Sequence, residues 1–219
     1  MLILGIETSL PSGFIVLGKE DEILASFTLP AKSSSREIVV AIKNVFEKTG
    51  LDVRKLDVIA VTRGPGSFTG SRVGISCAKA LSFSLGVPVV GISTIDLIAF
   101  SLPVTESLCV LVPGYGGCFF AGFFFHKNGK MERKGDYLFL PLDKIKDMAK
   151  KLTEGKMVFV SYPHLSSGRS GEILEVKVNL PAGLLRWAKD EIKLKKFDDP
   201  FSLSPLYVSP PITGRIENG

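Results

Sequence analysis

Histidine and cysteine are scarce in this chain, which has two histidines and three cysteines among its 219 residues. His126 and His164 are 38 positions apart, so they cannot form the i, i+3 or i, i+4 pair that binds a metal on one helix face. Cys77, Cys109 and Cys118 form no Cys-x-x-Cys pair and leave one thiol over, which argues against a zinc site and a disulfide framework. We therefore expect reduced cysteines, no metal and a core that folds without staples.

Long apolar runs are also missing from the chain. No window approaches the roughly 18 apolar residues of a membrane-spanning helix. The segment from Met1 to Glu7 has neither the basic start nor the longer apolar region of a signal peptide, and we expect it to form the first strand. Hydrophobic residues make up 45% of the chain and charged residues 22%, which is typical of a globular protein. The prediction is a cytoplasmic protein that does not bind membranes.

The net charge of +5 comes from one part of the chain. Residues 1–100 contain 10 Lys or Arg and 9 Asp or Glu, and residues 101–125 contain one acid, whereas residues 126–219 contain 17 basic and 12 acidic residues. Such an excess helps an anionic partner such as RNA to dock. Lysines that alternate with acidic and apolar residues, as in 143–151, are also typical of a solvated surface helix, which is the interpretation we favour.

Strand and helix patterns follow each other in two similar blocks, roughly 105 residues apart. Ser34 and Glu37 have capping-box spacing, and Gly50 is a natural end for the helix that they begin. The order predicts an α/β protein of two ribonuclease-H-like lobes, 1–103 and 104–219, with mixed sheets and flanking helices, as in the actin-like fold. The first block is expected to contain strands 2–8, 14–17, 22–28, 56–62 and 87–91 and helices 35–49, 70–85 and 94–102. The second is expected to contain strands 107–112, 118–125, 131–139, 157–162 and 172–178, helix 143–152 ended by Gly155, and helix 182–193.

A glycine-rich segment lies between a predicted strand and a predicted helix, where backbone N–H groups can bind an anion. It lacks the Lys of a Walker A loop, and Thr69 stands where a dinucleotide-binding loop needs its third Gly. A phosphate cradle and a tight structural turn therefore both remain open, and we favour the turn. The residues of this candidate phosphate-binding turn are Gly64, Gly66, Ser67, Thr69 and Gly70.

The turn after the first strand is a second candidate anion site, because Thr8 and Ser9 follow Glu7 there. A single carboxylate at a strand end is a weak signal, since such side chains are usually solvated. Hydrolase chemistry has no support, because the chain has no Gly-x-Ser-x-Gly motif and neither histidine is placed to act as a base. We therefore predict no catalytic residues.

The helix predicted after the glycine-rich segment has apolar residues on both sides. One side carries very small residues, which allow another element to approach closely. The other side is expected to carry Arg72, Ile75, Lys79 and Phe83. A helix with apolar groups on both sides should be covered on both, so a partner protein is one interpretation. Single exposed apolar residues are ordinary, and this second interpretation has equal weight.

Three stretches of the first block resemble the TsaB (YeaZ) family, which takes part in tRNA threonylcarbamoyladenosine synthesis. They are Leu-Gly-Ile-Glu-Thr-Ser at 4–9, Gly-Pro-Gly-Ser-Phe-Thr-Gly-Ser-Arg-Val-Gly at 64–74 followed by Ala-Lys-Ala-Leu at 78–81, and Pro-Val-Val-Gly-Ile-Ser-Thr at 88–94. The resemblance covers residues 1–100. Beyond residue 105, only Pro205 to Val208 is similar, to the C-terminal strand of the family.

The resemblance implies an actin-like two-lobe fold and a non-catalytic scaffold. The implied partners are a TsaD-type catalytic subunit, a TsaE-type ATPase and a second copy of the chain, with tRNA bound only through the complex. That complex transfers a threonylcarbamoyl group to the adenosine beside the anticodon. No cofactor of the chain itself is expected, although ATP or ADP at a subunit junction stays open. Mapped onto helices 35–49 and 70–85, the implied partner interface consists of Arg36, Val39, Val40, Lys43, Arg72, Ile75, Ser76, Lys79 and Phe83.

The chain departs from two patterns. The TsaD family has Cys-Asp-Glu-Thr where this chain has Leu10 to Gly13, and it binds a metal through a His-x-x-x-His pair that is absent here. Residues 112–117 and Ser209 differ from the usual TsaB sequence, so no contact is inferred for them. The alternative to a scaffold is a small actin-fold kinase or ATPase that binds a nucleotide at the two turns.

Overall fold

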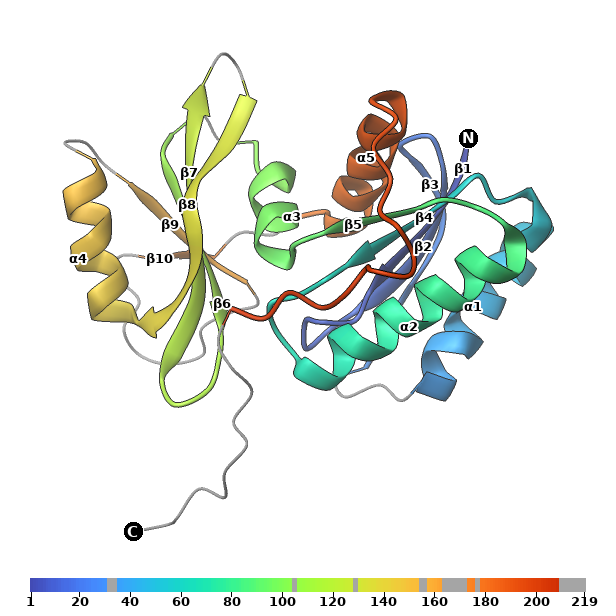
Figure 1. The fold of residues 1–219 in the computed structure, drawn as a ribbon, viewed down its shortest axis with the longest axis horizontal. Helices are drawn as coiled ribbons and strands as arrows, with labels where there is room; N and C mark the ends of the chain where they lie inside the picture. The colour runs from blue at the N-terminus through green and yellow to red at the C-terminus, as the bar shows by residue number, and fades with distance from the viewer. Residues whose placement is uncertain are drawn as a thin grey trace, which may run out of the picture.

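The structure, a computed structural model, describes residues 1–30, 35–103, 106–127, 130–153, 157–162, 173–175 and 178–208. It contains two five-stranded mixed sheets with helices packed against them (Figure 1). Ser34, Gly155, His164 and Ser209, which the sequence singled out, lie outside the described residues. Within the described part of the chain, no helix has the length and hydropathy needed to cross a membrane.

The first sheet has the strand order β3-β2-β1-β4-β5. Its strands are β1 (Leu2–Glu7), β2 (Phe14–Lys19), β3 (Glu22–Thr28), β4 (Val58–Thr62) and β5 (Val89–Ile92). The first three are antiparallel, and β4 and β5 run parallel to β1. Every residue of β1 and β4 is buried, because helices cover both faces of the sheet. This two-sided burial explains their nearly continuous apolar sequences.

The second sheet repeats this arrangement with the order β10-β9-β6-β7-β8. Its strands are β6 (Leu108–Pro113), β7 (Cys118–Lys127), β8 (Lys130–Pro141), β9 (Val158–Ser161) and β10 (Ile173–Glu175). The antiparallel strands β6 to β8 and the parallel strands β9 and β10 match the first sheet one for one. The two predicted blocks are therefore two lobes of the same topology.

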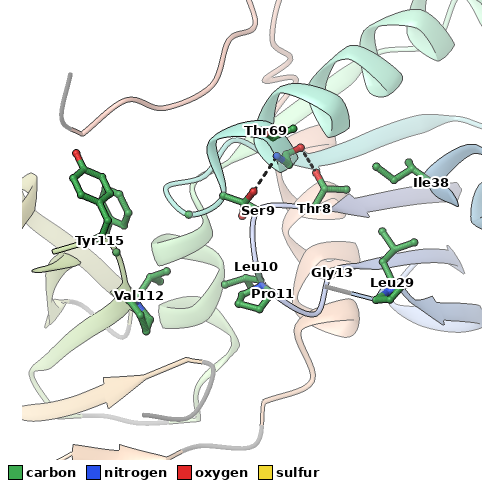
Figure 2. A pocket seen from close by; sticks show the side chains of 17 residues that line it. Thr8, Ser9, Leu10, Pro11, Gly13, Leu29, Ile38, Thr69, Val112 and Tyr115 are labelled. Atoms are coloured by element: carbon green, nitrogen blue, oxygen red, sulfur yellow. Dashed lines mark hydrogen bonds between the residues drawn. The ribbon is translucent and has the colours of Figure 1, made fainter. Parts of the chain in front are cut away.

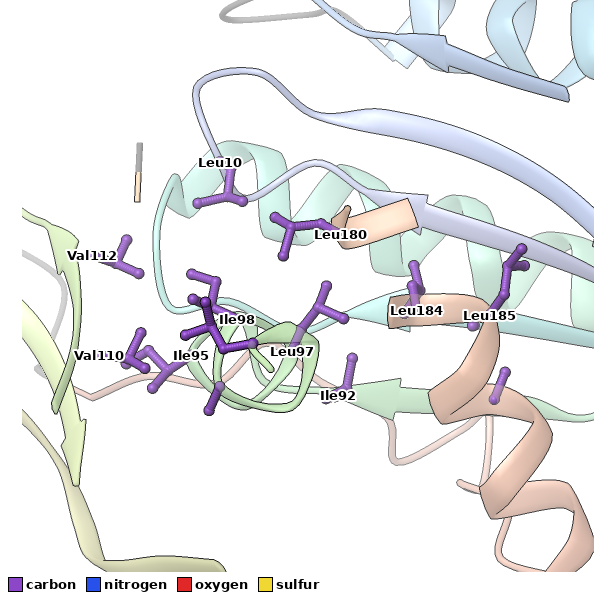
Figure 3. Close-up of a cluster of buried hydrophobic side chains, with 14 of the residues drawn as sticks. Leu10, Ile92, Ile95, Leu97, Ile98, Val110, Val112, Leu180, Leu184 and Leu185 are labelled. Atoms are coloured by element: carbon purple, nitrogen blue, oxygen red, sulfur yellow. The ribbon is translucent and has the colours of Figure 1, made fainter. Parts of the chain in front are cut away.

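Helices α1 (Ser35–Thr49) and α2 (Phe68–Leu85) lie on one face of the first sheet, and α5 (Leu180–Lys193) lies on the other (Figure 1). Helix α3 (Thr94–Ser101) lies between the two sheets, and α4 (Leu142–Leu152) packs on the outer face of the second. A short 3-10 helix, η1 (Val53–Lys55), precedes β4. The core that joins the lobes is centred on α3 and α5 (Figure 3) and includes Leu10, Ile92, Ile95, Leu97, Ile98, Val110, Val112, Leu180, Leu184 and Leu185.

Helix α1 has the predicted bounds. Its apolar residues recur with a helical period, so that Ile38, Ile42 and Val45 are buried against the sheet. Gly50 has a φ of 66°, a left-handed conformation that glycine adopts without strain and that ends the helix.

The structure corrects the predicted position of Ile75. This side chain is 3% exposed and belongs to the core between α2 and the first sheet, so it cannot be part of a partner surface. Ala78, one turn further along the same helix, is buried with it, whereas Arg72 and Phe83 are exposed. Periodicity placed Ile75 on the wrong side because α2 has apolar residues on both sides.

The C-terminal part of the chain returns to the first lobe. Helix α5 contacts β1 to β4 of the first sheet, although residues 104–219 were expected to form the second lobe. Asn179 caps this helix by accepting a hydrogen bond from the N–H of Ala182, so the helix begins two residues before the predicted start. Residues 205–208 form an extended segment rather than the strand that the family resemblance implied.

Candidate functional site

A cleft of about 850 Å³ lies between the two lobes (Figure 2). One wall comes from the turn after β1, the end of β3, the start of α1 and the loop before α2. The other wall comes from the end of β6 and the hairpin that connects it to β7. The described lining residues are Thr8, Ser9, Leu10, Pro11, Gly13, Leu29, Pro30, Ile38, Gly66, Ser67, Thr69, Gly70, Val112, Pro113, Gly114, Tyr115 and Phe120.

The turn after β1 is closed by its own carboxylate. Glu7 is fully buried at the end of the strand, and its Oε1 accepts hydrogen bonds from the N–H of Ser9 at 2.5 Å and of Leu10 at 2.7 Å. The Ser9 hydroxyl donates to the same oxygen at 2.9 Å. An internal carboxyl group thus occupies the N–H groups of Ser9 and Leu10, which a phosphate bound in this turn would need.

Burial raises the pKa of Glu7, and this effect outweighs the interactions with Thr62, Leu10 and Ser9 that lower it. The second carboxylate oxygen, Oε2, and the buried hydroxyl of Thr62 form no hydrogen bond of regular geometry among the described residues, although Thr62 is close enough to lower the pKa of Glu7. Thr62 is the last residue of β4, the parallel neighbour of β1. The end of the central strands therefore contains a buried polar pair beneath the cleft.

The second predicted turn is satisfied internally in part. The Ser67 N–H donates to the carbonyl of Ser9 at 2.7 Å, and the Ser67 hydroxyl caps α2 by accepting from the N–H of Gly70 at 3.1 Å. The Gly64 carbonyl accepts from the N–H of Thr94. These bonds join the two turns to each other and to the start of α3.

The glycines of this region allow the two turns to approach closely. A side-chain methyl group at Gly66 would overlap the carbonyl oxygen of Ser9, and one at Gly70 would overlap the carbonyl oxygen of Thr8. At Gly74, one turn further along α2, it would overlap the Thr8 hydroxyl. The glycine-rich segment therefore has a packing function that the sequence motif alone did not reveal.

Of the predicted phosphate-binding residues, all except Gly64 line the cleft, and Figure 2 shows Thr8, Ser9 and Thr69 close together. None of the described residues that line the cleft is Lys, Arg, His, Asp or Glu. The described residues also contain no group of three or more His, Cys, Asp or Glu side chains that could bind a metal ion. Phosphate binding at these turns stays a prediction. The described lining residues supply no cation to balance the charge of a phosphate.

Residues of the predicted partner interface on α1 form an exposed stripe. Val39 and Val40 are 57% and 47% exposed, and Arg36 and Lys43 beside them are also exposed. Lys43 forms an i, i+4 ion pair with Glu47 at 3.2 Å. The combination of large apolar side chains with flanking charges is compatible with a docking surface.

The outer side of α2 is different, because the C-terminal strap, which we define as residues 197–208, runs along it (Figure 1). Lys79 Nζ donates to the carbonyl oxygens of Phe201 at 3.1 Å and Leu203 at 3.2 Å. The ring of Phe83 packs edge-on against that of Phe201, with 4.7 Å between the centroids. Ser76, by contrast, is exposed.

Arg72 lies at the other end of the strap. Its Nε donates to the Tyr207 hydroxyl at 3.0 Å, and its guanidinium lies 3.8 Å from the ring centroid of Phe68. Arg63 donates to the carbonyl of Ser204 and is 141 positions away from it in the chain. Sequence reasoning missed the strap because no local periodicity signals a contact of this separation.

The comparisons with known proteins agree with this geometry. The family model described as "TsaD: tRNA N6-adenosine threonylcarbamoyltransferase" matches residues 28–152, which is more than half of the chain. A curated relative, the tRNA threonylcarbamoyladenosine biosynthesis protein TsaB of Bacillus subtilis (strain 168), is 30% identical over 135 residues, or 61% of this chain and 59% of that protein. The protein of the same name from Escherichia coli (strain K12) is 30% identical over 99 residues, or 45% and 43%. The chain spans about half the length of the curated relatives it matches.

Solved structures confirm the predicted actin-like α/β fold. YeaZ from Pseudomonas aeruginosa superposes with a TM-score of 0.74 at 18% identity and covers 94% of this chain and 99% of its own. The activator of the 2-hydroxyisocaproyl-CoA dehydratase from Clostridium difficile has a TM-score of 0.51 at 13% identity and covers 89% and 97%. At these identities the likeness concerns the fold alone.

Proposed function

The chain belongs to the family whose model is described as "TsaD: tRNA N6-adenosine threonylcarbamoyltransferase" and is similar to TsaB (YeaZ) proteins, and on this premise we propose that it is an accessory subunit in the synthesis of threonylcarbamoyladenosine in tRNA. In this role it has no catalytic chemistry of its own. It binds a TsaD-type catalytic subunit, and a TsaE-type ATPase and the tRNA join only in the complex.

The observation that carries the non-catalytic role is the chemistry of the cleft. Its described lining has no ionisable side chain apart from the phenol of Tyr115, so it offers no general base, no cation for a phosphate and no carboxylate pair for a metal. The one acid nearby, Glu7, is buried beneath the turn and holds it closed. A protein with such a cleft contributes binding surface rather than reacting groups.

The surface proposed for the catalytic subunit is the α1 stripe of Arg36, Val39, Val40 and Lys43, together with the exposed Ser76 of α2. Val39 and Val40 supply apolar area that becomes desolvated on docking, and the charges around them fix the orientation. We also propose that a second copy of the chain binds the same stripe and forms a homodimer when the catalytic subunit is absent.

A charge at the centre of this stripe tests the proposal. Val40→Glu should weaken binding to the TsaD-type subunit of the same organism by more than tenfold, because docking would bury an unpaired carboxylate. The measurement is size-exclusion chromatography with light scattering, on each protein alone and on the mixture. Circular dichroism should show an unchanged fold, since Val40 is half exposed.

Leu194→Glu is the matched control. Leu194 is 61% exposed at the end of α5, on the opposite face of the first sheet from α1, and its substitution should leave the complex intact. If the Val40 and Leu194 variants both bind like the wild type, the proposed surface is wrong. If the wild-type chain forms no complex at high micromolar concentration, the accessory role itself is wrong.

A further inference from the structure

We propose that the cleft between the lobes binds an uncharged, planar aromatic ligand of about the size of a nucleoside and discriminates against its phosphorylated forms. The site is the cavity described above, and the proposal does not depend on the accessory role. A volume of about 850 Å³ lies within the usual range of roughly 300–1,000 Å³ for small-molecule sites.

The aromatic wall of the cleft suits a flat ring. Tyr115 is 42% exposed at the mouth, and its ring packs against Phe139 with 4.5 Å between centroids. The ring of Phe120 also packs against Phe139, with 4.6 Å between the centroids. Phe139 thus links the other two rings, and the three support one another and hold Tyr115 in place. A supported, partly exposed ring is a stacking platform that loses little entropy when a ligand binds.

The opposite wall is aliphatic. Figure 2 shows Leu10 and Pro11 of the turn after β1 across the cleft from Val112 and Tyr115. Leu10 is buried in the core that joins the lobes, and this burial fixes the position of the wall. Pro11, the next residue, is exposed to the cleft. A planar molecule between the two walls would have apolar contacts on both faces, which is the arrangement that binds aromatic rings in protein pockets.

The described lining of the cleft favours an uncharged ligand over a charged one. The N–H groups of Ser9, Leu10 and Ser67 are already hydrogen-bonded inside the protein, so neither turn offers them to a phosphate. No cation is found among the described lining residues, and a charge that leaves water without a partner incurs a large desolvation cost. The Glu7 carboxylate beneath the turn adds a repulsive charge whenever it is ionised.

The test uses three probes that share one ring system and differ in charge: adenosine, adenosine 5′-monophosphate and magnesium ATP. Their affinities for the full chain are measured by isothermal titration calorimetry and by ligand-detected NMR. We expect saturable adenosine binding, at least tenfold weaker binding of the monophosphate, and weaker binding still of magnesium ATP. Tyr115→Ala should reduce adenosine binding on the order of tenfold, because one stacking contact is lost.

Tyr207→Ala is the matched control, because Tyr207 is a similarly exposed tyrosine on the strap and does not line the cleft. It should bind adenosine like the wild type. Tighter binding of magnesium ATP than of adenosine would overturn the proposal. It would also be overturned if adenosine, guanosine and indole all failed to bind at millimolar concentration, or if Tyr115→Ala left adenosine binding unchanged.

Discussion

The buried carboxylate of Glu7 accepts two hydrogen bonds from Ser9, one from its backbone N–H at 2.5 Å and one from its hydroxyl at 2.9 Å. The Ser9 hydroxyl also lies 2.6 Å from that of Thr94, the first residue of α3. One acid at the end of β1 therefore connects the first turn of the cleft to the helix that joins the lobes. Such fully buried polar networks are sensitive to the loss of any member.

Glu7→Gln is expected to fold and to change the pH dependence of stability. The amide can keep the accepted hydrogen bonds, and its NH₂ group supplies a donor to the nearby Thr62 hydroxyl, which in the wild type interacts with the Glu7 carboxyl group. Burial raises the pKa of Glu7 above its ordinary 4.5, so the folded state binds this proton more tightly than the unfolded state. The Glu7 contribution is therefore fully present below pH 4.5 and is lost as the pH rises through the folded-state pKa.

The measurement is the free energy of unfolding in urea at a series of pH values. The Gln variant should lack the loss of stability that wild-type Glu7 causes on going from acid to neutral pH. Glu7→Ala serves as the contrast, because it leaves the N–H groups of Ser9 and Leu10 without an acceptor and should cost about 3 kcal/mol. A Gln variant with the same pH profile as the wild type would contradict this account.

Local patterns in the sequence predicted the elements well. Capping signals and apolar periods gave helix 35–49 with its observed bounds, and the two blocks of strands became two sheets of equal topology. Ile75 was misplaced because α2 has apolar residues on both sides, and only the contact with the sheet decides between them. Helix α5 and the strap could not be placed, since they contact the first lobe across more than a hundred residues of chain.

The candidate site was predicted in part. The sequence identified both turns, but a turn that binds a phosphate and one that is closed by its own side chains can have the same glycines. The difference lies in where the N–H groups of Ser9, Leu10 and Ser67 point, and this is a property of the tertiary structure. Tyr115 and Phe120 gave no signal of a site, because their place in the cleft depends on the packing of the two lobes.

Gly74→Ala should destabilise the protein by about 2 kcal/mol, although alanine is the better helix former. The added methyl group would overlap the Thr8 hydroxyl, which is fixed by its hydrogen bond to the carbonyl of Gly70 at 2.7 Å. Thermal unfolding followed by circular dichroism measures the effect. Thr8→Ala removes the clashing oxygen, so adding Gly74→Ala to the Thr8→Ala variant should cost much less stability than adding it to the wild type. If Gly74→Ala costs the same stability in both backgrounds, the clash is not the cause.

Lys79→Met should loosen the C-terminal strap without unfolding the lobes. The substitution removes both hydrogen bonds from Nζ to the carbonyls of Phe201 and Leu203, while the aliphatic stem remains. Chymotrypsin should then cut faster after Phe201, which is 78% exposed. A loss of about 1 kcal/mol in the free energy that holds the strap in place corresponds to an increase in cleavage rate by a factor of about five. Lys43→Met is the control, because Lys43 pairs with Glu47 on α1, and equal cleavage of both variants would refute the role of Lys79.

A contact between Tyr137 and Asp96 ties β8 of the second lobe to α3. The phenol donates to Asp96 Oδ2 at 2.6 Å, and burial together with the neighbouring carboxylate raises the pKa of Tyr137 to about 12. Tyr137→Phe should reduce stability by about 1 kcal/mol, since Asp96 keeps only the more distant Arg133, whose Nε is 3.6 Å from Oδ1. In an alkaline titration followed by tyrosine absorbance, the variant should also lack one phenol that ionises only at high pH. Tyr115→Phe should leave that late step in place, and its disappearance in this control would show that the step had been assigned to the wrong ring.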